Sequence, residues 1–96
     1  RALVDVAAAE FTQAERSLDV AKAQVAAARA GVTEARAGQG RAQADYERWE
    51  SEATRVADLV TRRVVEAQTG DETRKQFRSA ASAREEAAAK VASAEQ

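Results

Sequence analysis

The side chains that could take part in chemistry are almost all charged. The 96-residue chain carries 15 Lys and Arg against 16 Asp and Glu, and it contains no His and no Cys. Without these two residue types, no nucleophile–base pair can be assembled, and no imidazole or thiolate can hold a metal ion. The carboxylates follow helical patterns on faces that we expect to be solvated. We therefore expect no enzyme, no catalytic residue, no metal site and no cofactor.

The distribution of charge also argues against two classes of partner. The formal net charge is -1, and acidic residues balance the basic ones along the same helices, so that no basic stripe forms and we expect no nucleic-acid partner. A helix that lies on a membrane surface needs Lys and Arg beside a bulky apolar face. Most apolar residues here are Ala and Val, and no run of about 20 apolar residues exists that would span a membrane.

One short stretch combines charge with apolar side chains and departs from the pattern around it. Its candidate partner-binding residues are Arg55, Leu59, Arg62, Arg63, Val64, Val65 and Glu66. Such a stretch offers an ionic and an apolar contact at once. The spacing allows two interpretations: ordinary surface residues in a loop, or a contact patch displayed at the end of a helical hairpin.

A seven-residue repeat precedes this stretch, and the helix that the repeat predicts would hold the stretch in place. With Val4 counted as position a, the a positions are Val4, Phe11, Leu18, Val25, Val32, Gln39, Tyr46, Ala53 and Val60. The d positions are Ala7, Ala14, Ala21, Ala28, Ala35, Ala42, Trp49 and Val56. A repeat sustained over this length predicts a coiled coil, and a strict seven-residue period predicts a left-handed supercoil. Large residues at a and Ala at most d positions allow two helices to approach closely.

The sequence Gly38-Gln39-Gly40 is the weakest part of this helical pattern. Each Gly costs a helix interior about 1 kcal/mol relative to Ala, so a turn at this point is the alternative. The register does not shift across the glycines, since Ala35, Ala42 and Tyr46 remain in phase. We therefore predict an uninterrupted helix.

The repeat ends near residue 61 and a second helical pattern follows. Thr69 and Glu72 match a capping box, with Thr69 as N-cap, and Glu66 is the alternative helix start. The apolar stripe of this second helix contains Phe77, Ala80, Arg84, Ala87, Val91 and Ala94. The prediction is all-α: a long antiparallel two-helix coiled-coil hairpin with helix one at about 2–62, the tip at about 63–69 and helix two at about 70–96.

The two predicted helices differ in length. If the chain folds back near residue 65, Gln96 lies near residue 34 and the seam of residues 4–32 has no partner within the chain. Because both ends of the chain fall inside a helical pattern, we expect a fragment of a larger protein. Either a second copy covers this seam or the natural chain continues past Gln96, and for the fragment itself we expect self-association. The outward f positions Ala9, Ala23, Ala30, Ala37 and Ala44 reflect either helix propensity or side-by-side packing of neighbouring hairpins.

The tip resembles the α-hairpin of periplasmic adaptor proteins, the HlyD-like membrane fusion proteins of tripartite efflux and type I secretion systems. The residues that carry the resemblance are Arg55, Leu59, Val64, Val65, Gln68 and Asp71. The resemblance covers the whole chain, but only the tip is specific. One position departs from the family pattern, because Glu66 stands where the family usually has Ser or Thr.

The resemblance implies a non-catalytic docking module in the periplasm, within a parent protein attached to the inner membrane. Its implied partners are a TolC-like outer-membrane channel at the tip, neighbouring adaptor hairpins packed in a ring, and an inner-membrane transporter reached through domains absent from this chain. The rival hypothesis is a generic coiled-coil dimerisation or scaffold segment.

Overall fold

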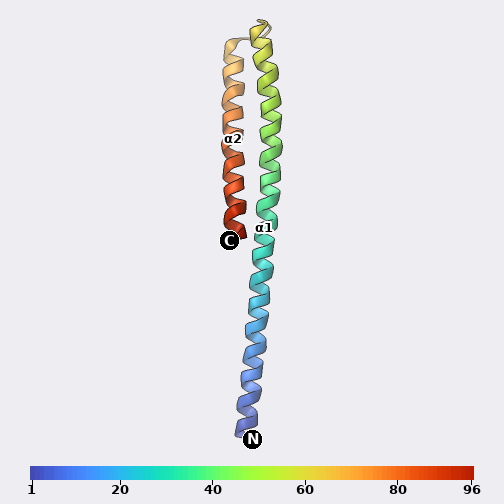
Figure 1. The fold of residues 1–96 in the computed structure, drawn as a ribbon, viewed down its shortest axis with the longest axis vertical. Helices are drawn as coiled ribbons and strands as arrows, with labels where there is room; N and C mark the ends of the chain where they lie inside the picture. The colour runs from blue at the N-terminus through green and yellow to red at the C-terminus, as the bar shows by residue number, and fades with distance from the viewer. The chain divides into compact units, whose positions relative to one another are not determined.

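The computed structural model describes residues 1–96 and contains two α-helices and no strands. Helix α1 spans Ala2–Thr61 and helix α2 spans Ala67–Glu95 (Figure 1). The all-α prediction is confirmed. The chain divides into two units, Arg1–Gly31 and Val32–Gln96.

Helix α1 continues through Gly38 and Gly40, so the alternative of a turn at these glycines is wrong. A Cβ atom added to Gly40 would meet nothing within 4 Å, and one added to Gly38 would reach only the end of the Arg41 side chain at 3.6 Å. Neither glycine is needed for a close approach of another helix. The helix tolerates them because the residues around them pack in register against α2.

The unit of residues 32–96 is an antiparallel hairpin, in which α2 runs beside the second half of α1 (Figure 1). Three contacts define its register. A Cβ on Gly70 would lie 3.0 Å from the Val60 side chain, the Arg84 guanidinium lies 3.8 Å from the centre of the Tyr46 ring, and Arg36 pairs with Glu95 at 2.7 Å. In each pair the two residue numbers average close to 65, which agrees with the prediction that the chain folds back near residue 65.

The seam between the two helices follows the predicted heptad on α1. Its a and d residues from Val32 to Val60 are all buried or half-buried, and Val56 is the least exposed at 5%. On α2 the seam residues are Gly70, Thr73, Phe77, Ala80, Arg84, Ala87, Val91 and Ala94. The predicted stripe is therefore confirmed and extends one turn further toward the tip, to Gly70 and Thr73.

Aromatic side chains form the centre of the seam and explain the Arg on its apolar stripe. The rings of Tyr46 and Phe77 lie 5.3 Å apart at 40°, a tilted arrangement that aromatic pairs favour. Arg84 covers the face of Tyr46, and such a cation–π contact contributes about 0.5–1 kcal/mol. Arg84 thus occupies a seam position without burying an unpaired charge.

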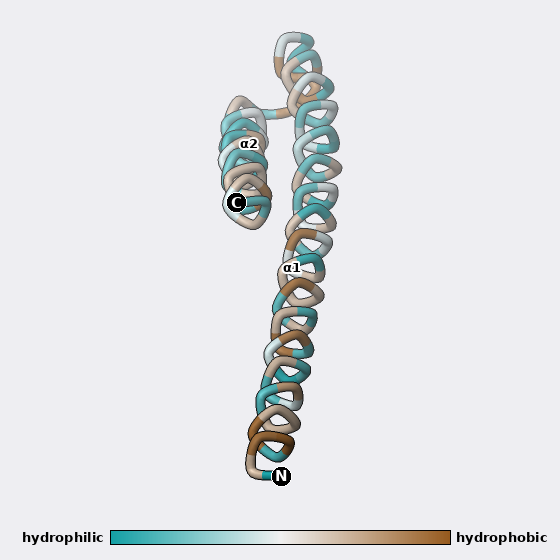
Figure 2. Tube along the Cα trace, turned by 60° about the horizontal axis from the view of Figure 1, so that its bottom comes forward, coloured by the Kyte–Doolittle hydropathy of each residue, from teal (hydrophilic) through white to brown (hydrophobic).

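The unit of residues 1–31 is a single helical segment of α1, and every one of its residues is exposed. Apolar turns recur along it (Figure 2). The larger exposed side chains are Leu3, Val4, Val6, Phe11, Leu18, Val20 and Val25. This exposure agrees with the prediction that the seam here has no partner within the chain. Neither helix combines the length and apolar character needed to cross a membrane.

Candidate docking site at the hairpin tip

The chain reverses direction over residues 62–66, between the end of α1 and the start of α2. The Val64 N–H donates to the Leu59 carbonyl oxygen at 2.9 Å, and the Arg63 N–H donates to the Val60 carbonyl oxygen at 3.0 Å. These two bonds form a Schellman motif, which satisfies carbonyl groups left open at a helix C-terminus. The reversal is therefore a tight, internally bonded turn.

Arg63 occupies the left-handed position of this motif, with φ of 59°, and is the only non-glycine residue with positive φ. Gly is usual at this position because a Cβ atom is strained there. The backbone turns at Arg63 because α2 packs back onto α1. The strained backbone leaves the Arg63 side chain exposed at the apex of the hairpin.

Helix α2 begins at the alternative start, Glu66, and not at the predicted capping box of Thr69. Its N-cap is Glu66, with extended φ and ψ of -72° and 151°, and the Glu66 side chain makes no capping hydrogen bond. The predicted capping box at Thr69 is wrong, because the Thr69 N–H bonds the Glu66 carbonyl oxygen at 3.1 Å inside the first turn. The tip shortens from about 63–69 to 62–66, and Gly70 and Thr73 lie in the seam.

The basic residues of the candidate site are exposed, and two of them form local ion pairs. Arg62 pairs with Asp58 at 3.3 Å, and Arg55 pairs with Glu52. Such exposed pairs between residues three or four apart contribute only about 0.3–0.5 kcal/mol. Either guanidinium group can therefore exchange its carboxylate for a group on a partner at little cost.

The apolar residues of the site differ in exposure. Val64 is 67% exposed at the turn, whereas Leu59 and Val65 are half-buried. The structure thus brings six of the seven predicted residues together within residues 59–66, and Val64 offers the most accessible apolar surface. Arg55 lies further back on α1, about 10 Å from Arg62 along the helix axis at 1.5 Å per residue.

A groove lies beside the tip, and sequence reasoning did not identify it. Its lining consists of Ala53, Ala57, Val60, Thr61, Ala67, Gly70, Asp71 and Arg74. The groove exists because Ala53, Ala57, Ala67 and Gly70 have small side chains or none. The small residues at these positions were the only feature of the sequence that could have predicted the groove. No group of side chains suited to holding a metal ion occurs in the chain.

Substituting Gly for Arg63 is expected to stabilise the hairpin. Relief of the left-handed backbone strain outweighs the greater flexibility of Gly in the unfolded chain, for a net gain of about 0.5–1 kcal/mol. Thermal unfolding followed by circular dichroism should show a rise of a few degrees. Arg62→Gly is the matched control and should lower the melting temperature, because residue 62 does not have positive φ. A lower melting temperature for Arg63→Gly would contradict this account of the turn.

Comparison with known proteins found no matching protein family, no matching curated protein and no matching solved structure.

Proposed function

We propose that this chain is the α-hairpin of a periplasmic adaptor protein, a structural and docking module without catalytic activity. In this proposal the tip binds the periplasmic helical ends of a TolC-like outer-membrane channel. Further domains of the parent protein, attached to the inner membrane, engage the transporter. The observation that supports the proposal best is the tight reversal at residues 62–66, which exposes two Arg side chains and Val64 together.

The chemistry of the tip fits a helical partner. The C-terminal ends of helices present unpaired carbonyl groups with partial negative charge, to which guanidinium groups donate hydrogen bonds. Arg62 and Arg63 supply such donors, and the exposed Val64 supplies an apolar contact between them and the partner. Glu66 is also exposed and selects against a partner with acidic side chains at the facing position.

Lateral packing of hairpins belongs to the same proposal. The f-position alanines are exposed, namely Ala9, Ala23, Ala30, Ala37 and Ala44. Side chains this small permit neighbouring helices to approach closely. A left-handed supercoil, which the strict heptad predicts, would keep these positions on the outer face of each hairpin.

The rival function is a coiled-coil scaffold or dimerisation segment, and the exposed seam of residues 4–28 favours it. The two hypotheses differ in what they require of the tip. A scaffold segment needs the turn only to connect its helices, so the tip side chains would be replaceable. A docking module needs the charges and the apolar surface at the apex.

The test is binding of the 96-residue chain to a purified TolC-like channel in lipid nanodiscs, measured by biolayer interferometry. Arg63→Glu combined with Val64→Asp should weaken binding at least tenfold, since it reverses a charge and removes the apolar contact. Arg78→Glu with Ser79→Asp is the matched control, because it makes a similar change in charge on exposed residues of α2. Equal binding by the tip variant and the control would support the scaffold hypothesis.

A further inference from the structure

Four arginines form a row along α1, and the two that lie further from the tip have no part in the proposed docking. The four are exposed and seven residues apart, at heptad position c: Arg41, Arg48, Arg55 and Arg62. Asp45, Glu52 and Asp58 lie beside them, so the row carries little net charge. Guanidinium groups form their strongest hydrogen bonds with carboxylates. The row therefore fits a protein surface that carries acidic side chains at matching intervals.

Helix α2 has acidic side chains at matching intervals. With Gly70 counted as position a, position c of α2 holds four exposed residues, namely Glu72, Ser79, Glu86 and Ser93. The two glutamates are two heptads apart, and each heptad of the arginine row has the same length. The two rows do not pair with each other inside the hairpin, where their ion pairs are local.

The two rows match when neighbouring hairpins stand side by side with their tips level. Within a hairpin, residues of α1 and α2 whose numbers average 65 lie at the same height along the axis. With the tips level, Glu72 of one copy lies midway in height between Arg55 and Arg62 of the next, and Glu86 lies in the same way between the other two arginines. A shift of a whole heptad in either direction carries one glutamate past the end of the row.

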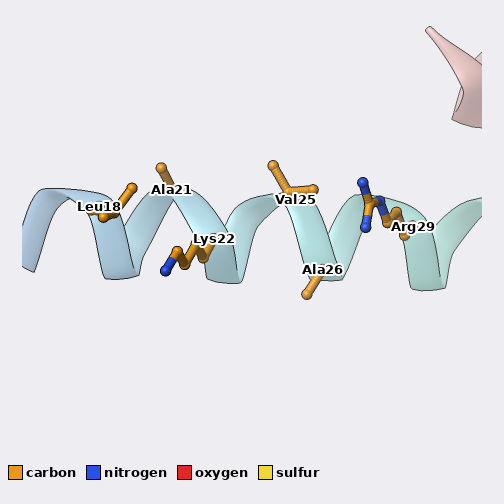
Figure 3. Close-up of a pocket in the computed structure, with 6 residues that line it drawn as sticks. All are labelled: Leu18, Ala21, Lys22, Val25, Ala26 and Arg29. Atoms are coloured by element: carbon orange, nitrogen blue, oxygen red, sulfur yellow. The ribbon is translucent and has the colours of Figure 1, made fainter.

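Small side chains in the middle of both outer faces allow the two helices to approach. Figure 3 shows the geometry of such a face further along α1, where the seam residues Ala21 and Val25 point to one side and Ala26, at position b, points to the other. Position f lies at the centre of the outer face. With the tips level, exposed f residues of the two helices alternate in height, in the order Ala37, Ala89, Ala44, Ser82, Ser51, Lys75 and Asp58. The first five are small, and the last two are oppositely charged.

We propose that α2 of one hairpin packs against α1 of a neighbouring copy, with the tips level and with Glu72 and Glu86 between the arginines of the row. This contact rests on the proposed function, in which neighbouring hairpins stand side by side on one channel. The two contacting surfaces differ, so every copy offers one of each, as the closure of a ring requires.

The charges set the register of this contact more than its strength. In the isolated hairpin they make local pairs at exposed positions, such as Glu86 with Lys90 at 3.4 Å. Pairs of this kind exchange for pairs with a neighbour at little cost. Position b is less favourable, because Glu47 lies close in height to Glu85 of the neighbour. The register therefore depends on the arginine row at position c.

Cross-linking between introduced cysteines tests the contact, because the chain has no cysteine of its own. Ser51 of one copy should lie beside Ser79 of the next, since both are exposed and at the same height. At roughly millimolar concentration, comparable with that of tethered neighbours, a short bismaleimide should join Ser51→Cys to Ser79→Cys about tenfold faster than to Ser93→Cys. Ser93 is the matched control, because it occupies position c two heptads further along α2, about 21 Å from Ser79. Equal rates, or no cross-link to Ser79→Cys, would overturn the proposed contact.

Charge reversal tests the role of the arginine row. Glu86→Arg in the Ser79→Cys chain should slow its cross-linking to Ser51→Cys about tenfold, because a guanidinium group then meets two others. Arg41→Glu with Arg48→Glu in the Ser51→Cys chain should restore the rate, while circular dichroism checks that all chains remain helical. Unchanged cross-linking by the Glu86→Arg chain, or no recovery with the reversed arginines, would contradict the proposed register.

Two controls separate this contact from docking at the tip. Glu10→Arg makes the same change in charge on a part of α1 outside the contact, and it should leave cross-linking unchanged. Arg63→Glu with Val64→Asp should also cross-link normally, although it should bind the channel weakly. Glu86→Arg, immobilised sparsely, should bind the channel as the wild type does. Failure of the lateral contact is therefore distinguishable from failure of docking.

Discussion

Asp in place of Val56 is expected to open the hairpin of residues 32–96. Val56 is the least exposed residue of the chain at 5%, and the register of the seam places it opposite Thr73, which is 9% exposed. The Thr73 hydroxyl already donates to the Thr69 carbonyl oxygen at 2.9 Å, so it has no proton left for a new carboxylate. A buried carboxylate without a partner costs about 3–5 kcal/mol.

A cost of this size is comparable with the whole stability of such a hairpin, which is roughly 3–10 kcal/mol at typical values per residue. Opening should be visible in the fluorescence of Trp49, the only tryptophan, which is half-buried in the seam. The emission should shift to the red and the cooperative melting transition should be lost. Val20→Asp makes the same substitution at an exposed position and should leave both signals unchanged. Retention of the native emission by Val56→Asp would argue against the seam described above.

Leu in place of Gly70 is expected to destabilise the hairpin even though Leu favours helices. A Cβ atom at residue 70 would lie 3.0 Å from Cγ2 of Val60, which is closer than ordinary contact. The Val60 side chain is short and branched, so it cannot move aside without displacing the helix. Overpacking of this kind costs about 1–3 kcal/mol, which exceeds the gain in helix propensity of about 1 kcal/mol.

Two further variants separate packing from propensity. Gly40→Leu makes the same change where no atom lies within 4 Å of the new Cβ, so it should raise the melting temperature. Adding Val60→Ala to Gly70→Leu exchanges the large and small partners of one layer and should recover most of the lost stability. If Gly70→Leu is as stable as Gly40→Leu, then α2 does not approach the Val60 side chain as closely as described.

The sequence predicted the register of the hairpin because one physical signal dominates it. Apolar residues at a seven-residue period must face another helix, and this requirement placed Tyr46, Trp49 and Val56 in the seam. The same requirement predicted that α1 continues through Gly38 and Gly40, as the structure shows. The free energy that these glycines cost the helix is smaller than the free energy gained by packing on either side of them.

The start of α2 was predicted less firmly, because the sequence offered two starts, the capping box at Thr69 and the alternative at Glu66. Thr69 and Glu72 satisfy a capping pattern, but the pattern describes local hydrogen bonds and ignores the packing of Gly70 against Val60. The left-handed conformation of Arg63 was also invisible, since the usual residue at that position is Gly. Tertiary packing therefore decided the boundary between tip and helix.

The candidate site was predictable as a location but not in its details. The change of pattern after Val60 indicated where the chain turns. The ion pairs of Arg55 and Arg62, by contrast, depend on side-chain conformations that spacing does not fix. The unequal exposure of Val64 and Val65 follows from the geometry of the turn, which places one outward and the other toward the seam.

Photocrosslinking from the apex tests most directly whether the tip is a docking surface. The chain would be secreted into the periplasm of cells that contain a TolC-like channel, with benzoylphenylalanine in place of Val64 or, as control, Ser79, both of which are exposed. We expect a covalent adduct with the channel from residue 64 and none from residue 79. Equal adducts from both positions, or no adduct from residue 64, would contradict it.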